Sequence, residues 1–169
     1  MVKRPLRKTN RTVLIVVEGE TELAFVTHLK NVYYRRGMRL SVNIKNAHGY
    51  GPQGVIDKLK TASLNADFDH RIAVLDSDIP LKASETKWLK QEKIALITSC
   101  PSIEGTLLEI LGKHVPQATP ACKTALQGHA PGNKTESRYY QKYFPFEQLE
   151  RGRHQTPVLA ALIAAVSTE

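Results

Sequence analysis

Acidic side chains follow three apolar segments of this 169-residue chain: first Glu18, then Asp76 and Asp78, then Glu104. The first segment, residues 13–17, has five consecutive apolar residues, which is typical of a strand buried on both faces. Parallel strands share one carboxyl-terminal edge, so we expect these acids to converge there. Asp76 and Asp78 are two residues apart, so both point to one side if the strand stays extended.

Carboxylates gathered in this way repel one another and destabilise the fold unless something neutralises them. A divalent cation removes the conflict, and Mg²⁺ and Mn²⁺ both prefer oxygen ligands in octahedral geometry. The sequence therefore predicts a Mg²⁺ or Mn²⁺ site at the strand ends.

The chain that follows Glu18 adds two more acids. Gly19 is expected to give the backbone the freedom for a tight turn, and residues 20–36 carry apolar side chains on one helical stripe. Glu22 then lies in the first helical turn, four residues after Glu18, and joins the predicted site. Glu20 is interpreted as an acid that complements the helix dipole.

The rest of the pattern alternates strands with helices. Further strands are expected at residues 40–44, 71–75 and 93–98, and helices at residues 52–62, 82–92 and 103–111. This alternation predicts an α/β fold, a doubly wound, Rossmann-like parallel sheet of about four strands with right-handed crossovers. In such sheets ligands bind outside the carboxyl ends of the strands. The alternating polarity of residues 40–44 places that strand at the sheet edge.

Composition divides the chain into three expected parts: a basic arm at residues 1–11, an α/β domain at residues 12–112, and a helical extension at residues 113–169 packed on the same domain. Helices are expected in the extension at residues 119–128 and 136–144, and from residue 157. The tyrosines of the second of these are expected to pack in the interior, not to act as nucleophiles: Tyr139, Tyr140 and Tyr143.

The net charge is +8, and five bases precede the first strand without an acid among them: Lys3, Arg4, Arg7, Lys8 and Arg11. This arm suggests nucleic acid or another polyanion as a partner, or a solubilising tail. No stretch has the ~18–20 apolar residues that a membrane span needs, and no signal peptide is recognisable, so we expect a cytoplasmic protein. A homodimer through the apolar C-terminal helix is an open expectation.

Several other features have both a functional and a plain interpretation. The glycine-rich residues 47–54 are either a simple connection or a substrate-facing loop that carries His48 and Tyr50. Two cysteines are too few for a disulfide framework, and Cys100 is expected to be a small buried residue. Five histidines lack metal-ligand spacing and are expected at the surface: His28, His70, His114, His129 and His154.

The acidic motifs resemble those of the Toprim family, the catalytic fold of topoisomerases, bacterial primases and OLD-type nucleases. In that family a Glu ends the first strand and an Asp-x-Asp ends the third, which here are Glu18 and Asp76-Ser77-Asp78. The Glu-Gly-x-x-Glu that begins at Glu18 and the Pro-x-x-Glu that ends at Glu104 are similar to motifs of OLD-type and RloB-type defence proteins. The resemblance covers residues 11–111.

This resemblance implies a Mg²⁺- or Mn²⁺-dependent endonuclease, a phosphodiesterase that acts in defence against phage or other foreign DNA. The residues implied to bind the ions, with Glu104 on a second ion or orienting the ligands, are Glu18, Glu22, Asp76, Asp78 and Glu104. OLD-type nucleases also use a late lysine, for which Lys142 and Lys134 are the candidates. DNA is favoured over RNA, and a separate ATPase chain is a candidate partner because the sequence has no Walker A motif.

Three alternatives remain at this stage. A phosphorelay receiver needs a fifth strand followed by a Lys, and it leaves Asp78 unexplained. A haloacid-dehalogenase-like phosphatase carries its Asp-x-Asp on the first strand, whereas here it follows the third. The third alternative is a non-catalytic Toprim-like module that binds metal and nucleic acid together with a partner protein, because fold analogy alone does not decide function.

Overall fold

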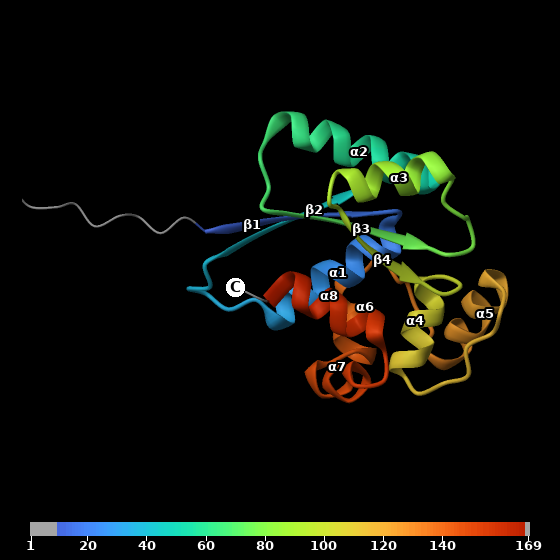
Figure 1. Ribbon diagram of the computed structural model, residues 1–169. Coiled ribbons are helices and arrows are strands. Elements are labelled where there is room, and N and C mark those ends of the chain that lie inside the picture. Colours follow the sequence, from blue (N-terminus) through green and yellow to red (C-terminus); the bar gives the residue numbers. More distant parts are fainter. Residues whose placement is uncertain (1–9, 168–169) are drawn as a thin grey trace, which may run out of the picture.

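The computed structural model describes residues 10–167 and has a four-stranded, all-parallel sheet between two layers of helices (Figure 1). The strands are β1 (Arg11–Val17), β2 (Leu40–Asn46), β3 (His70–Asp76) and β4 (Ala95–Ser99). The helices of the described part are α1 (Glu20–Tyr33), α2 (Gly51–Asn65), α3 (Ala83–Gln91), α4 (Ile103–Ile110), α5 (Thr119–His129), α6 (Ser137–Tyr143), α7 (Phe146–Arg153) and α8 (Pro157–Ser167). The predicted α/β class, the parallel sheet and its four strands are confirmed.

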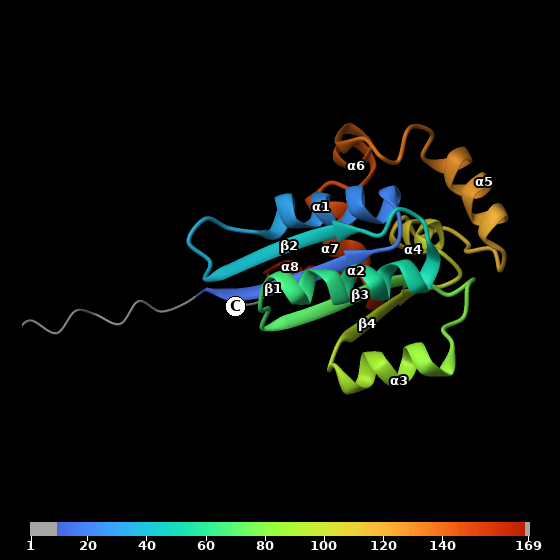
Figure 2. The same ribbon diagram turned by 90° about the horizontal axis from the view of Figure 1, so that it is seen from above.

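The strand order is β2-β1-β3-β4, which places β2 at one edge as expected. The chain leaves β1 through α1 to β2, then crosses the opposite face through α2 to reach β3 on the other side of β1. Figure 2 shows these crossings from above. Successive strands are therefore added on one side of β1 (β2) and then on the other (β3, β4), so the strand order reverses between β1 and β3. In open α/β sheets a crevice for ligands forms at that point, outside the strand ends.

Strand β1 is the centre of both hydrophobic cores. Its residues Val13, Ile15 and Val17 face the larger core under α1, α4 and α8, and Leu14 and Val16 face the smaller core under α2 and α3. All five side chains are 3% exposed or less, so the prediction of a strand buried on both faces is confirmed. Burial on both faces holds the carboxyl end of β1 in a fixed position.

The C-terminal helices complete the larger core and support the start of α1. Tyr140 and Phe144 pack against Phe25 with ring centroids 5.5 and 6.1 Å away, and the Tyr140 hydroxyl donates a hydrogen bond to the Thr21 carbonyl at 3.1 Å. Tyr139 and Tyr140 are buried, as predicted.

The expectation of a surface position is wrong for His28, whose buried Nε2 lies 2.8 Å from the Phe144 carbonyl oxygen.

Several elements differ from the sequence prediction in their bounds, and one helix is additional. Helix α1 ends at Tyr33 and not at residue 36, because Tyr34 adopts an extended conformation with ψ 127°. Helix α7 was not predicted at all, because its sequence is mostly polar, with Leu149 and Gly152 as its buried residues. The basic arm lies almost wholly outside the described residues; of its five bases only Arg11 belongs to them, as the first residue of β1.

No helix between residues 10 and 167 has the length and apolar character that crossing a bilayer requires.

Candidate active site

A pocket of about 260 Å³ opens at the carboxyl ends of β1 and β3, where the strand order reverses. Six acidic residues line it, and they include every acid that the sequence analysis assigned to the metal site: Glu18, Glu20, Glu22, Asp76, Asp78 and Glu104. Lys123 contributes the basic side chain of the lining. The structure thus brings the predicted acids together, and it adds Glu20, which we had interpreted only as a helix-start residue.

Glu18 and Asp76 are neighbours because β1 and β3 are paired strands. The Asp76 backbone N–H donates a long hydrogen bond of 3.4 Å to Glu18 Oε2. Partial burial raises the pKa of Glu18, and the negative charge of Asp78 raises it further, against the opposing effect of that hydrogen bond. The carboxylate therefore lies in a site that disfavours its own charge.

Glu22 lies one helical turn further on and is 6% exposed. Burial raises its pKa to about 6, and the charges of Glu104 and Glu18 contribute in the same direction. The role of Gly19 differs from the one predicted, since its φ of −142° is an extended conformation that any residue adopts. A Cβ at Gly19 would instead lie 3.1 Å from Glu22 Oε2, so the glycine leaves space for this carboxylate.

Asp76 has the most strongly perturbed carboxyl group of the pocket. Its Oδ1 is buried and has no hydrogen-bond partner. Burial is the largest cause that raises its pKa to about 8, and the charges of four neighbouring acids add to it: Glu22, Glu18, Glu104 and Asp78. A buried oxygen without a donor is costly, so this atom requires a proton or a cation to compensate it.

Strand β3 ends at Asp76, so Asp78 lies in the bend that follows the strand, where it is exposed. The extended geometry that would direct both aspartates to one side is therefore not kept, although both still line the pocket. Asp78 Oδ2 accepts a hydrogen bond of 2.8 Å from Thr119 Oγ1, the first residue of α5. This bond holds the start of α5 against the acidic pocket.

Glu104 reaches the pocket from the first turn of α4 and is 5% exposed. Ser102 Oγ donates a hydrogen bond of 2.9 Å to Glu104 Oε2. The Ser77 N–H, just after β3, donates to the Ser99 carbonyl at the end of β4 at 2.9 Å and to the Pro101 carbonyl in the loop before α4 at 3.1 Å. The segment after Asp76 is therefore connected directly to the loop that leads to Glu104.

The close approach of α4 to this loop depends on Gly105. A Cβ added there would lie 2.9 Å from the Cys100 carbonyl oxygen and 3.0 Å from Pro101 Cδ. Cys100 itself is exposed, so the expectation that it is a buried residue is wrong.

Gly105→Ala is expected to destabilise the protein by about 1–3 kcal/mol, because the added methyl group forces the α4 backbone away from the preceding loop. Chemical denaturation of both proteins measures the change. The matched control is Gly128→Ala in α5, where a Cβ would meet nothing within 4 Å and the helix should gain about 0.5–1 kcal/mol. Equal effects of the two substitutions would contradict this role of Gly105.

The lysine of the pocket is not one of those named from the sequence. Lys142 and Lys134 do not line the pocket; their Nζ atoms lie 4.7 Å from the Tyr143 ring centre and 5.9 Å from the Tyr139 ring centre. Lys123 lies on α5 four residues after Thr119, on the same side of the helix. That spacing was readable from the sequence, but nothing in the sequence showed that α5 folds over the strand ends.

The donors of the pocket suit a hard divalent cation, because they are carboxylate oxygens. The unpartnered Asp76 Oδ1 also fits a cation ligand. Within the part of the chain that the structure describes, no three His, Cys, Asp or Glu side chains already stand in a metal-holding arrangement. The acids share a pocket without converging on one point, as mutually repelling groups do.

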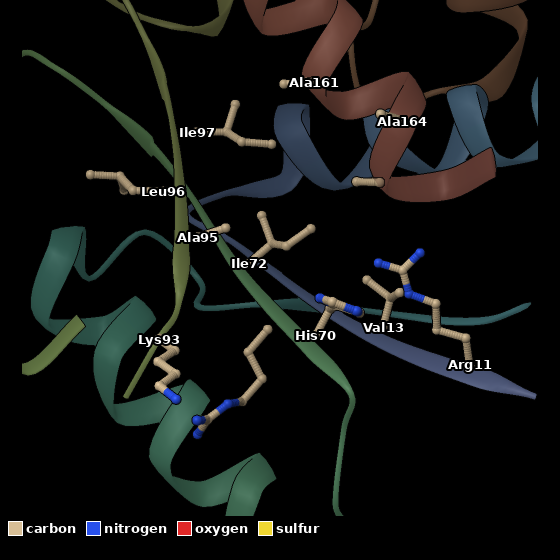
Figure 3. A pocket seen from close by; sticks show the side chains of 12 residues that line it. Arg11, Val13, His70, Ile72, Lys93, Ala95, Leu96, Ile97, Ala161 and Ala164 are labelled. Carbon is tan, nitrogen blue, oxygen red and sulfur yellow. The ribbon is translucent and has the colours of Figure 1, made fainter. Parts of the chain in front are cut away.

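A larger cavity of about 480 Å³ lies at the opposite, amino-terminal end of the sheet (Figure 3). Its floor is apolar, with Ile72, Leu96 and the alanines of α8, and Arg11 and Lys93 also line it. Ligands of open α/β sheets bind at the other ends of the strands. The smaller acidic pocket is therefore the candidate active site.

No protein-family model, no curated protein and no solved structure matches this chain. The candidate site is therefore interpreted from its own residues, their burial and their charges.

Proposed function

We propose that this protein is a metal-dependent nuclease of Toprim type, which hydrolyses phosphodiester bonds in DNA or RNA. The observation that carries the proposal is the pocket of six acids at the strand ends where the strand order reverses, with a buried Asp76 oxygen that lacks a partner. The order of the acids along the strands supports the Toprim assignment, with Glu18 after the first strand and Asp76 at the end of the third.

The proposed ligands of the cations are the acids at the strand ends and in the first helical turns: Glu18, Glu22, Asp76, Asp78 and Glu104. Bound cations of this kind activate a water and stabilise the leaving oxygen of an in-line displacement. The chain itself contributes the positions of the carboxylates. Lys123 adds a positive charge beside them, where it would contact a phosphate oxygen of the substrate.

Nuclease assays on supercoiled plasmid, duplex oligonucleotides and single strands of DNA and RNA test this proposal. We expect cutting with Mg²⁺ or Mn²⁺ and none with EDTA. Nucleic-acid binding without cutting under all of these conditions would favour the alternative, a Toprim-like binding module that acts with a partner protein. The proposals of a role in defence, an ATPase partner and a homodimer rest on the resemblance and on the apolar C-terminal helix.

Lys123→Ala is expected to reduce the cutting rate by about 10²–10³-fold, because it removes a positive charge that stabilises the transition state. Stability should change by no more than about 0.5 kcal/mol, since the side chain is exposed. Lys142→Ala is the matched control on a neighbouring helix and should cut like the wild type. If Lys142→Ala loses cutting and Lys123→Ala does not, the assignment of Lys123 is contradicted and Lys142 is the catalytic lysine.

A further inference from the structure

The loop between β2 and α2 presents an aromatic side chain beside the acidic pocket. Tyr50 is 78% exposed, which makes it the most exposed tyrosine of the chain. We propose that Tyr50 stacks on an unpaired base next to the phosphate that enters the acidic pocket, so the substrate is single-stranded nucleic acid. This inference rests on the proposed function and names its substrate class.

The loop is fixed directly to the strand end that carries Glu18. The Gly49 N–H donates a hydrogen bond of 2.8 Å to the Glu18 carbonyl, and the Ala47 N–H donates one of 2.9 Å to the Val17 carbonyl. The His48 N–H donates to a side-chain oxygen of the last residue of β2 at 2.7 Å. Tyr50 therefore follows a segment that is held in place relative to the candidate active site.

The backbone of this loop adopts a conformation that is costly to maintain. His48 has a φ of 60°, the left-handed region that a residue with a Cβ enters at a cost of about 1–2 kcal/mol. Gly49 and Gly51 continue with φ of 77° and 61°. Strain such as that at His48 clusters at functional sites. The positive φ of Gly49 and Gly51, which glycine adopts without strain, turns the chain sharply on both sides of Tyr50.

Two residues connect the acidic pocket with the space beside Tyr50. Gly49 and Ile79 line the acidic pocket, and both also line an adjoining cavity of about 330 Å³. That cavity is further lined by Tyr50, Pro80, Lys82 and Glu85, and Glu85 Oε2 accepts a hydrogen bond of 2.6 Å from the Lys82 backbone N–H. Tyr50 thus lines the cavity that adjoins the acidic pocket. In that cavity Tyr50 and Ile79 offer apolar contacts for a base, and Lys82 offers an ammonium group for a phosphate.

The chemistry of this second cavity fits a nucleotide. The Ile79 side chain is 49% exposed, so it and Tyr50 leave apolar surface open to solvent beside a charged pocket. A phosphate held at the acidic pocket would place the flanking base over this surface. Only an unpaired base has a free face to stack on an aromatic ring, since the bases of a duplex stack on one another.

The other tyrosines of the chain have different surroundings. Tyr139 and Tyr140 are buried in the larger core, and the remaining three, Tyr33, Tyr34 and Tyr143, are partly buried and donate their hydroxyl groups to protein oxygens. A core or packing role explains those five. It does not explain Tyr50, whose side chain is exposed.

Fluorescence anisotropy with labelled oligo-dT and oligo-rU, with Ca²⁺ in place of Mg²⁺ so that a cation still neutralises the acidic pocket while the strands stay uncut, tests the proposal. Tyr50→Ala is expected to weaken binding of the single strands by about 5- to 150-fold, the loss expected for one stacked base. Tyr50→Phe should bind within about twofold of the wild type because it keeps the aromatic face. A duplex of the same length should bind both variants and the wild type equally.

A second measurement follows the stacking itself. In a Trp88→Phe background, Tyr50→Trp gives a protein with one tryptophan, at the proposed stacking position. Oligo-dT or oligo-rU should quench its fluorescence, and the duplex should not. The single strand that reaches half-maximal quenching at the lower concentration is the better ligand, DNA or RNA, and either result supports the proposal.

Equal single-strand affinity of Tyr50→Ala and wild type would overturn the proposal, as would an equal loss on single strand and duplex or no measurable single-strand binding. The outcomes are separate from those of the nuclease assay. A protein that cuts nothing with Mg²⁺ but loses oligo-dT affinity in Tyr50→Ala retains this inference and loses the nuclease assignment. If the protein cuts but Tyr50→Ala binds single strands like the wild type, the nuclease assignment is retained and the inference about Tyr50 is lost.

Discussion

Asp76→Asn is expected to abolish cutting and, in the same protein, to make the metal-free fold more stable. The carboxyl group of Asp76 is buried, its Oδ1 has no hydrogen-bond partner, and four other acids raise its pKa. Asparagine has nearly the same shape but carries no charge, so it removes both the repulsion and a cation ligand. Function and stability then change in opposite directions, as expected where an active site is strained.

The cutting rate with Mg²⁺ should fall by at least about 10³-fold, which is the scale expected when charge stabilisation at a reacting phosphate is lost. The free energy of unfolding of the metal-free protein near neutral pH should rise by on the order of 2 kcal/mol. For a domain of this size that gain raises the melting temperature by about 4–8 °C.

Asp67→Asn is the matched control, because Asp67 is an exposed aspartate in the loop before β3, at the other end of that strand. It should leave both the cutting rate and the melting temperature close to those of the wild type. Calorimetric melting in EDTA and a cutting assay on the same preparations provide the two readouts. A less stable Asp76→Asn protein that still cuts would contradict the assignment of Asp76.

The stability of the metal-free protein is expected to fall as the pH rises from about 4 to about 8. The pKa of Asp76 is about 8 in the folded protein against 3.8 in the unfolded chain, and that of Glu22 is about 6 against 4.5. In this window the folded state holds protons that the unfolded state has released. The stabilisation is fully present below pH 3.8 and is lost as the pH passes the folded-state values.

Urea denaturation in EDTA at several pH values measures this dependence. Between about pH 5 and about pH 8 the loss should be on the order of 2 kcal/mol in the wild type and clearly smaller in Asp76→Asn. Mg²⁺ at saturating concentration should restore most of the loss at the higher pH, because a ligand that binds only the folded state stabilises it. Wild-type stability that rises with pH throughout this window would show that the acids are not buried together.

Local pattern was sufficient to predict the sheet and the gathering of the acids in one pocket at its carboxyl edge. The run of apolar residues at 13–17 marks β1, and the carboxyl edge of a parallel sheet then places Glu18 and Asp76 side by side, since β1 and β3 pair directly. No long-range information was needed for this step. The same reasoning extended to Glu104 because a fourth parallel strand precedes it.

Long-range contacts explain what the sequence did not reveal. Lys123 joins the pocket through α5, which is held there by a hydrogen bond between Thr119 and Asp78, 41 residues apart. The burial of His28 depends on Phe144, which lies 116 residues further along the chain. Neither pairing leaves a periodic or compositional signal, so the sequence did not indicate that Lys123 lines the pocket, and His28 was expected at the surface.

The loop that carries Tyr50 was only partly predictable from the sequence. Its glycines marked residues 47–54 as irregular, and His48 and Tyr50 were noted as functional candidates. The sequence could not distinguish a plain connection from a loop facing the site. The structure shows the hydrogen bond from the Gly49 N–H to the Glu18 carbonyl, and that contact places the loop beside the acidic pocket.

Calorimetric titration of Mn²⁺ into the metal-free protein tests most directly whether the acids at the strand ends form a cation site. We expect saturable binding by the wild type near neutral pH, accompanied by proton release, because Asp76 must lose its proton to bind the ion. Asp76→Asn should bind much more weakly, and Asp67→Asn should bind like the wild type. Equal binding by all three proteins, or no saturable binding by the wild type, would contradict the metal site and the function built on it.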